Sequence, residues 1–105
     1  MEFKRLITFE RSASGLFSET EVMELELALV FAPESGDLIP GGKGLRKIRR
    51  ALAGRGKSGG ARVIYYYISN AATIYLVFAY AKNRQSDLTK NQLAALAEFV
   101  AAQIP

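Results

Sequence analysis

The sequence predicts an α+β fold, in which a four-stranded, mainly antiparallel sheet carries helices on one of its faces. The chain has 105 residues, half of them hydrophobic, which is enough for one core and fits a single domain over residues 1–105. Two amphipathic segments each follow a helix-capping signal. Three consecutive strand segments, separated by turn residues, occupy the region between them. The predicted order of elements is therefore β-α-β-β-β-α.

The first half of the chain contains a strand and a helix. A short strand is predicted over residues 4–9 and a helix over residues 19–32. Ser18 and Glu21 have the spacing of a capping box, in which the two residues bond reciprocally at a helix N-terminus. Pro33 ends the helix, and the Pro- and Gly-rich residues 38–44 form a loop. The expected buried face of the helix consists of Val22, Leu25, Ala28, Leu29 and Ala32.

The second half contains three strands and a helix. The strands are predicted over residues 45–52, 61–69 and 73–82. A glycine-rich loop over residues 54–60 joins the first two, and a tight hairpin joins the last two. Residues 87–89 introduce a helix that ends near residue 103, with Thr89 and Gln92 at capping-box spacing. Its apolar stripe consists of Leu93, Leu96, Ala97, Val100 and Ile104.

Two residue types are missing from the chain, which contains neither cysteine nor histidine. Disulfides, thiolate nucleophiles and the usual zinc sites are therefore excluded, as is the commonest general base. No run of 18 apolar residues could span a membrane, and the N-terminus lacks the apolar region of a signal peptide. We therefore expect a cytoplasmic protein without a membrane partner.

The charges are unevenly distributed along the chain. Residues 1–40 contain three basic and eight acidic side chains, whereas residues 41–70 contain eight basic and none that is acidic. A concentrated positive field of this kind attracts phosphate backbones through counterion release. The alternative is a solvated face that only maintains solubility. The absence of any acid across the basic segment favours a nucleic-acid partner.

Four basic residues on the three central strands are the candidate catalytic groups: Lys47, Arg49, Arg62 and Lys82. Cleavage of RNA by its own 2′-hydroxyl needs a base, positive groups that stabilise the transition state, and an acid for the departing 5′-oxygen. Arginine and lysine supply the positive groups, and a lysine whose pKa is lowered by neighbouring cations could supply the base. A phosphate-binding surface without catalysis is an equally good interpretation of these four residues.

Further residues are candidates for RNA contact. Tyr66 shares a strand face with Arg62, where it could stack on a base or pack in the core. Arg55 and Lys57, in the glycine-rich loop, and Arg46, at the start of the basic strand, are expected to contact the RNA backbone.

Several of these segments resemble the RelE/HigB family of toxins. The resemblance is carried by residues 44–49, 54–60 and 62–67, and continues in Tyr75-Leu76 and in residues 80–83 and 86–89. It extends from about residue 36 to residue 89 and is closer to the HigB-like branch than to RelE itself.

The resemblance implies a microbial-ribonuclease-like α+β fold and endonucleolytic cutting of messenger RNA in the ribosomal A site, which inhibits translation. It also implies a neutralising antitoxin, often with a helix-turn-helix domain, so that operator DNA is contacted only through the antitoxin. No cofactor and no metal are expected, because a cationic site repels metal ions.

Residue by residue, the family's basic strand pair falls on Lys47 and Arg49, its arginine on Arg62, and its later basic position near Lys82. Three positions depart from the family pattern. Asn83 stands where RelE-like members have a catalytic arginine, Thr89 where they have a tyrosine, and Arg84 where HigB-like members have an acid.

We still expect Asn83 and Arg84 to contact RNA, but the departures leave the base and the proton donor unassigned. Two alternatives therefore stay open beside the nuclease. One is a degenerate RNA-binding module without catalysis, and the other is a module that only binds the antitoxin.

Overall fold

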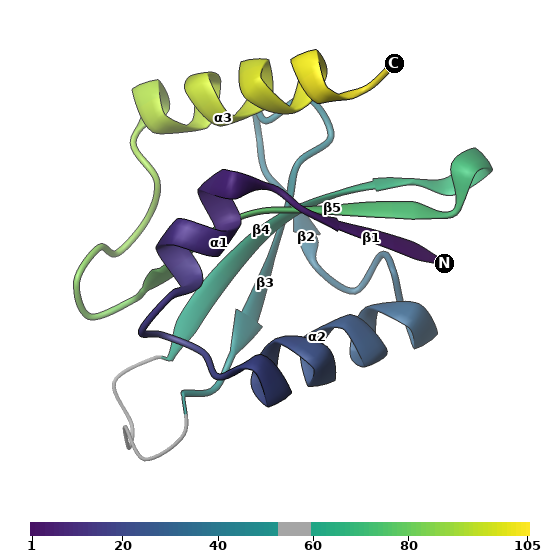
Figure 1. The fold of residues 1–105 in the computed structure, drawn as a ribbon. Helices are drawn as coiled ribbons and strands as arrows, with labels where there is room; N and C mark the ends of the chain where they lie inside the picture. Colours follow the sequence, from purple (N-terminus) through teal and green to yellow (C-terminus); the bar gives the residue numbers. More distant parts are fainter. Residues whose placement is uncertain (53–59) are drawn as a thin grey trace.

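The computed structural model describes residues 1–52 and 60–105. Within them the strands form one five-stranded sheet in the order β1-β5-β4-β3-β2 (Figure 1). The pairing of β1 with β5 is parallel and the other three pairings are antiparallel, so the predicted α+β fold with a mainly antiparallel sheet is confirmed. The strands are β1 (Glu2–Arg5), β2 (Asp37–Leu38), β3 (Arg46–Arg50), β4 (Ala61–Ile68) and β5 (Thr73–Ala81).

The prediction of four strands is wrong because the short strand β2 was assigned to a loop. Asp37 and Leu38 pair with Lys47 and Arg46, so β2 extends the sheet beyond β3. A two-residue strand between Gly36 and Ile39 has too short a hydrophobic pattern to be detected in a sequence.

The predicted strand over residues 4–9 is also wrong beyond Arg5, because the helix α1 (Ile7–Ala13) begins there. Phe9 and Ala13, one helical turn apart, are buried against the sheet. On another side of the helix, Thr8 donates to the carbonyl of Val77, and the Ser12 hydroxyl accepts from the Ala79 amide at 2.9 Å. The helix therefore satisfies backbone groups of β5 beyond the point where β1 ends.

Helices cover both faces of the sheet, so the prediction that they share one face is wrong. α2 (Glu19–Phe31) and α3 (Lys90–Gln103) lie on opposite sides of the sheet (Figure 1). The cause lies in β4 and β5, whose residues are apolar on both faces and must be buried on both. On the side of α1 and α2 the core includes Phe9, Leu25, Leu29, Val63, Tyr65 and Leu76. On the side of α3 it includes Leu45, Ile64, Tyr75, Val77, Leu96 and Val100.

Both predicted capping boxes are present. The Ser18 hydroxyl accepts from the Glu21 amide at 3.1 Å while the Glu21 carboxylate accepts from the Ser18 amide at 2.8 Å. Thr89 and Gln92 form the same reciprocal pair, with both distances 3.0 Å. The helices α2 and α3 therefore begin where their capping signals predict. Among the described residues, no helix is long and apolar enough to cross a membrane.

Candidate active site

The strand register brings three of the four predicted catalytic residues onto one face of the sheet. Arg49 on β3 lies directly opposite Arg62 on β4. Lys47 is two residues before Arg49 and so points to the same side. This side is the one covered by α3, because Ile64, the partner of Lys47, packs in the α3 core. We call Lys47, Arg49 and Arg62 the cationic face.

A bulge in β5 adds Tyr80 to this face. Ile64 pairs with Phe78 but Tyr65 pairs with Leu76, so Val77 is an extra residue in β5. Without the extra residue, Arg62 would lie opposite Ala79. With it, Arg62 lies opposite Tyr80. The bulge thus re-aims the end of β5 and places a phenol beside an arginine.

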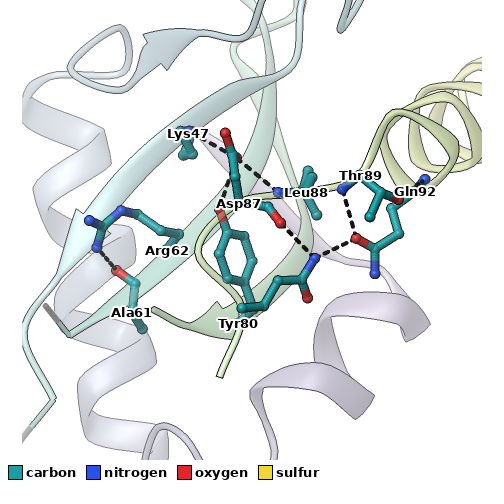
Figure 2. A network of polar contacts seen from close by, with 9 residues as sticks. Lys47, Ala61, Arg62, Tyr80, Asp87, Leu88, Thr89 and Gln92 are labelled. Carbon is teal, nitrogen blue, oxygen red and sulfur yellow. Dashed lines mark hydrogen bonds and ion pairs between the residues drawn. The ribbon is translucent and has the colours of Figure 1, made fainter. Parts of the chain in front are cut away.

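Arg62 is held firmly within this group. Arg62 is only 7% exposed, and one of its guanidinium nitrogens donates to the carbonyl of Ala61 at 3.3 Å (Figure 2). A cation in such a partly desolvated place interacts more strongly with a phosphate than one surrounded by water. The same group can make several hydrogen bonds to phosphate oxygens in a fixed plane.

The carboxylate of Asp87, in the segment that leads into α3, links two members of the site. One of its oxygens accepts from the ammonium group of Lys47 at 3.2 Å and from the hydroxyl of Tyr80 at 3.4 Å (Figure 2). The Leu88 amide donates to the same oxygen at 2.8 Å. The Leu88 amide, followed by Lys47, lowers the pKa of Asp87, so the carboxylate is ionised at neutral pH.

Tyr80 has the opposite electrostatic behaviour. Burial, followed by the nearby charge of Asp87, raises the pKa of Tyr80 to about 12. A phenol is protonated at neutral pH even at its ordinary pKa of 10.0, and the raised pKa makes Tyr80 a weaker acid that can still protonate an alkoxide oxygen. The site combines three cations, a fixed carboxylate and a buried acid.

The remaining predicted residues near β5 lie where that strand ends. Lys82 follows the last residue of β5, its side chain is exposed, and its amide donates to the carbonyl of Gly60 at 2.9 Å. Asn83 and Arg84 lie in the turn that follows and border a cleft of about 460 Å³. Ser12 and Ser14, from the α1 region, also line this cleft.

Two predicted RNA-binding residues do not join the cationic face. Arg46 points to the opposite side of the sheet, where its guanidinium donates to the carbonyl of Gly36 at 2.8 Å and pairs with Glu34 at 3.3 Å. Tyr66 packs in the α3 core, beside Gly44 and the C-terminal half of α3. Arg55 and Lys57 lie outside the described residues.

Tyr80 and Asp87 were not predicted as site residues, although the sequence contains a signal for each. Tyr80 and Lys82 are two residues apart in a predicted strand, and residues at this spacing share one face of a sheet. Asp87 is the first acidic residue after Asp37, so a lone carboxylate follows a long basic segment and should pair with one of its cations. Within residues 1–52 and 60–105, no three His, Cys, Asp or Glu side chains come together as metal ligands would.

Comparison with known protein families identifies the class to which this chain belongs. Over residues 9–104 the chain matches the family described as the RelE toxin of the RelE/RelB toxin–antitoxin system. The chain therefore belongs to the RelE toxin family, and such membership implies an antitoxin partner. The match is to the family as a whole and does not separate a HigB-like branch.

A solved structure of one family member has a similar fold. It is a variant of the Escherichia coli toxin RelE, with two arginines replaced by alanine, in the free state. The superposition has a TM-score of 0.54 at 15% sequence identity and covers 94% of this chain and 95% of the other. At this identity the likeness establishes the fold, and the roles of individual side chains have to be argued from their own geometry.

Proposed function

We propose that this chain is an endoribonuclease that cuts messenger RNA in the ribosomal A site and so inhibits translation in the cytoplasm. The observation that carries the proposal is the row across three strands in which buried Arg62 lies between Arg49 and Tyr80. A surface that only bound phosphate would need the arginines, but it would have no use for a buried phenol beside them.

The row suits transesterification by the RNA itself. The 2′-hydroxyl loses its proton to solvent water as its oxygen forms a bond to phosphorus, and the bond to the 5′-oxygen then breaks. Charge accumulates on the phosphate oxygens between these events. Arg62 and Arg49 stabilise that charge, and Lys47 and Lys82 add to the positive field around it. The Tyr80 hydroxyl, which donates to Asp87 in this structure, turns to give its proton to the departing 5′-oxygen, and Asp87 also holds Lys47 in place. In this scheme side-chain cations provide the stabilisation that a metal provides in other nucleases.

The partners follow from the family. We propose that a cognate antitoxin with a helix-turn-helix domain neutralises this chain, and that operator DNA is contacted only through that antitoxin. We also propose that the chain belongs to the HigB-like branch, which the segments at residues 44–49, 54–60 and 62–67 resemble.

The test is to induce the protein in bacteria and map the 5′ ends of cellular transcripts, with Arg62→Ala alongside. We expect cuts inside translated codons, lost in the Arg62 variant and retained in Arg11→Ala. The control removes an equal charge from the exposed end of α1, outside the cationic face. Circular dichroism and urea unfolding establish that both variants fold.

Three other outcomes would contradict this proposal. Intact transcripts from a folded protein that binds RNA would support a binding module without catalysis. Intact transcripts and no RNA binding would support a module that only contacts the antitoxin. Cuts that persist in Arg62→Ala would remove this residue from the site and sink the proposed geometry.

A further inference from the structure

The helix α2 is apolar on two faces. Val22, Leu25 and Leu29 are buried against the sheet. The outward face is apolar as well, since Met23 is 57% exposed and Leu27 is 59% exposed. A surface helix normally has a polar outward face, and one that is apolar all round is normally buried. The outward face of α2 therefore has the composition of a surface that another molecule covers.

This outward face borders a groove. The groove has a volume of about 490 Å³ and lies between α2 and the edge strand β1, which contributes Phe3. We call it the α2 groove. Its other lining residues are Thr20, Met23, Glu24, Glu26, Leu27 and Val30.

Acidic residues flank the apolar row of the groove. At 100° per residue, Met23, Leu27 and Val30 lie between Glu24 on one side and Glu26 on the other. Arg5 offsets part of this charge, because its guanidinium pairs with Glu26 and Glu19, both at 2.9 Å. Glu24 is exposed, and residues 1–40 as a whole contain eight acidic and three basic side chains. Arg49 and Arg50 of β3 line a second pocket together with Glu24 and offset part of its charge too. The exposed side of α2 stays negative because this helix contains four acidic and no basic residues.

The charge decides between possible occupants. A second copy of this chain would bring an equally acidic α2 against the first, and the rims would repel each other. A helix that combines an apolar stripe with flanking lysines and arginines matches both the apolar row and its acidic rim. We propose that the α2 groove is the docking site for such a basic amphipathic helix of a partner protein.

The docking site is separate from the proposed nuclease site. α2 packs on the Val63 and Tyr65 side of β4, whereas Arg62 and Ile64 face the α3 side. Binding in the α2 groove therefore leaves the cationic face open. The two proposals can fail independently.

The test is binding of a synthetic helical peptide to the full-length protein, measured by fluorescence anisotropy. The peptide has a leucine and isoleucine stripe flanked by Lys and Arg, and a matched peptide has the same stripe flanked by Glu. We expect the basic peptide to bind and the acidic one to bind at least about tenfold more weakly. Leu27→Ser should weaken binding of the basic peptide about tenfold or more, since a central apolar contact is lost.

Two further variants complete the design. Leu38→Ser removes an exposed leucine, 58% exposed, from β2 at the other edge of the sheet, and it should leave binding unchanged. Glu24→Gln should weaken binding and reduce its dependence on salt. RNA cleavage by Leu27→Ser should equal that of the unchanged protein.

The proposal is overturned if neither peptide binds, if both bind equally, or if Leu27→Ser binds as the unchanged protein does. It is also overturned if sedimentation equilibrium detects a dimer that Leu27→Ser dissociates, because the occupant would then be a second copy of the chain.

Discussion

Burial and two charged neighbours, Asp87 and Arg62, shift the pKa of Tyr80 in different directions. Burial and the charge of Asp87 raise its pKa, while the positive charge of Arg62 lowers it. The net result is a pKa of about 12, so the phenol retains its proton throughout the physiological range. In this structure the hydroxyl donates to Asp87, so proton donation to the 5′-oxygen requires the hydroxyl to turn from Asp87 toward the RNA.

Removing the Tyr80 hydroxyl should therefore abolish proton donation without disturbing the fold. We expect Tyr80→Phe to slow cleavage about 10²- to 10⁴-fold, which is the usual contribution of a general acid. RNA binding should remain near its original strength, because the phosphate contacts come from the arginines. Single-turnover cleavage on programmed ribosomes measures the first effect and anisotropy with a non-cleavable RNA the second. Unchanged cleavage would exclude Tyr80 as the acid.

Asp87 makes the stability of the protein depend on pH. Its folded pKa is lowered below the ordinary 3.8, so its contribution is present above that value and is lost as the pH falls through the folded pKa. Because its side chain is 64% exposed, the contribution is small, about 0.5 kcal/mol. Asp87→Asn should therefore lower the free energy of unfolding at neutral pH by about this amount.

The difference between Asp87→Asn and the unchanged protein should disappear as the pH is lowered through the carboxyl range. Urea unfolding across that range measures it. Glu98→Gln on the exposed surface of α3 is the matched control and should produce no such trend. A stability difference for Asp87→Asn that persists in acid would mean that the contacts of the ionised carboxylate, with the Leu88 amide and with Lys47, are not its cause.

At the scale of elements, local signals were sufficient for the helices α2 and α3. Capping boxes at Ser18 and Thr89, together with apolar spacing along each helix, depend on residues three or four apart. The whole helix α1 was missed, and a strand was predicted in its place, because Leu6 at its N-cap has no side-chain oxygen to accept a capping hydrogen bond and so provides no signal. Hydroxyl groups of this helix bond to β5, and a contact so distant in sequence leaves no local pattern.

The arrangement of the site residues likewise depends on contacts between segments that are distant in the sequence. Lys47, Arg49 and Arg62 could be named from their charge and strand spacing, but their convergence depends on register. Tyr80 depends in addition on the bulge at Val77, which shifts the pairing of β5 by one residue. Arg46 was expected to contact RNA, but alternation along β3 turns it to the opposite face, toward Glu34.

Thr89 gives a test at this scale, because its position has a structural explanation. It caps α3, and Thr89→Ala should lower the free energy of unfolding by about 1 kcal/mol. Amide exchange in the first turn of α3 should become faster than in α2. Thr89→Ser keeps the hydroxyl and should behave like the unchanged protein in urea unfolding. Equal stability of all three proteins would mean that packing of the apolar stripe alone holds α3.

The whole molecule separates its charges between two sides. The acidic residues 1–40 supply β1, α1, α2 and β2, and the α2 groove lies among them. The basic segment supplies β3 and β4, whose cationic face lies on the other side of the sheet. Such a separation orients the molecule in an electric field, so that its basic side meets a phosphate backbone first.

The separation predicts how RNA binding depends on salt. For single strands the logarithm of affinity falls with that of salt concentration by about 0.7 for each phosphate neutralised, so the four cations Lys47, Arg49, Arg62 and Lys82 predict a slope of about −3. Arg49→Ala should reduce the steepness by about 0.7, whereas Arg11→Ala, outside the cationic face, should leave it unchanged. Anisotropy titrations of a non-cleavable RNA over a series of salt concentrations provide the slopes. An equal reduction in Arg49→Ala and Arg11→Ala would mean that RNA responds only to net charge, and that the cationic face is not a specific phosphate site.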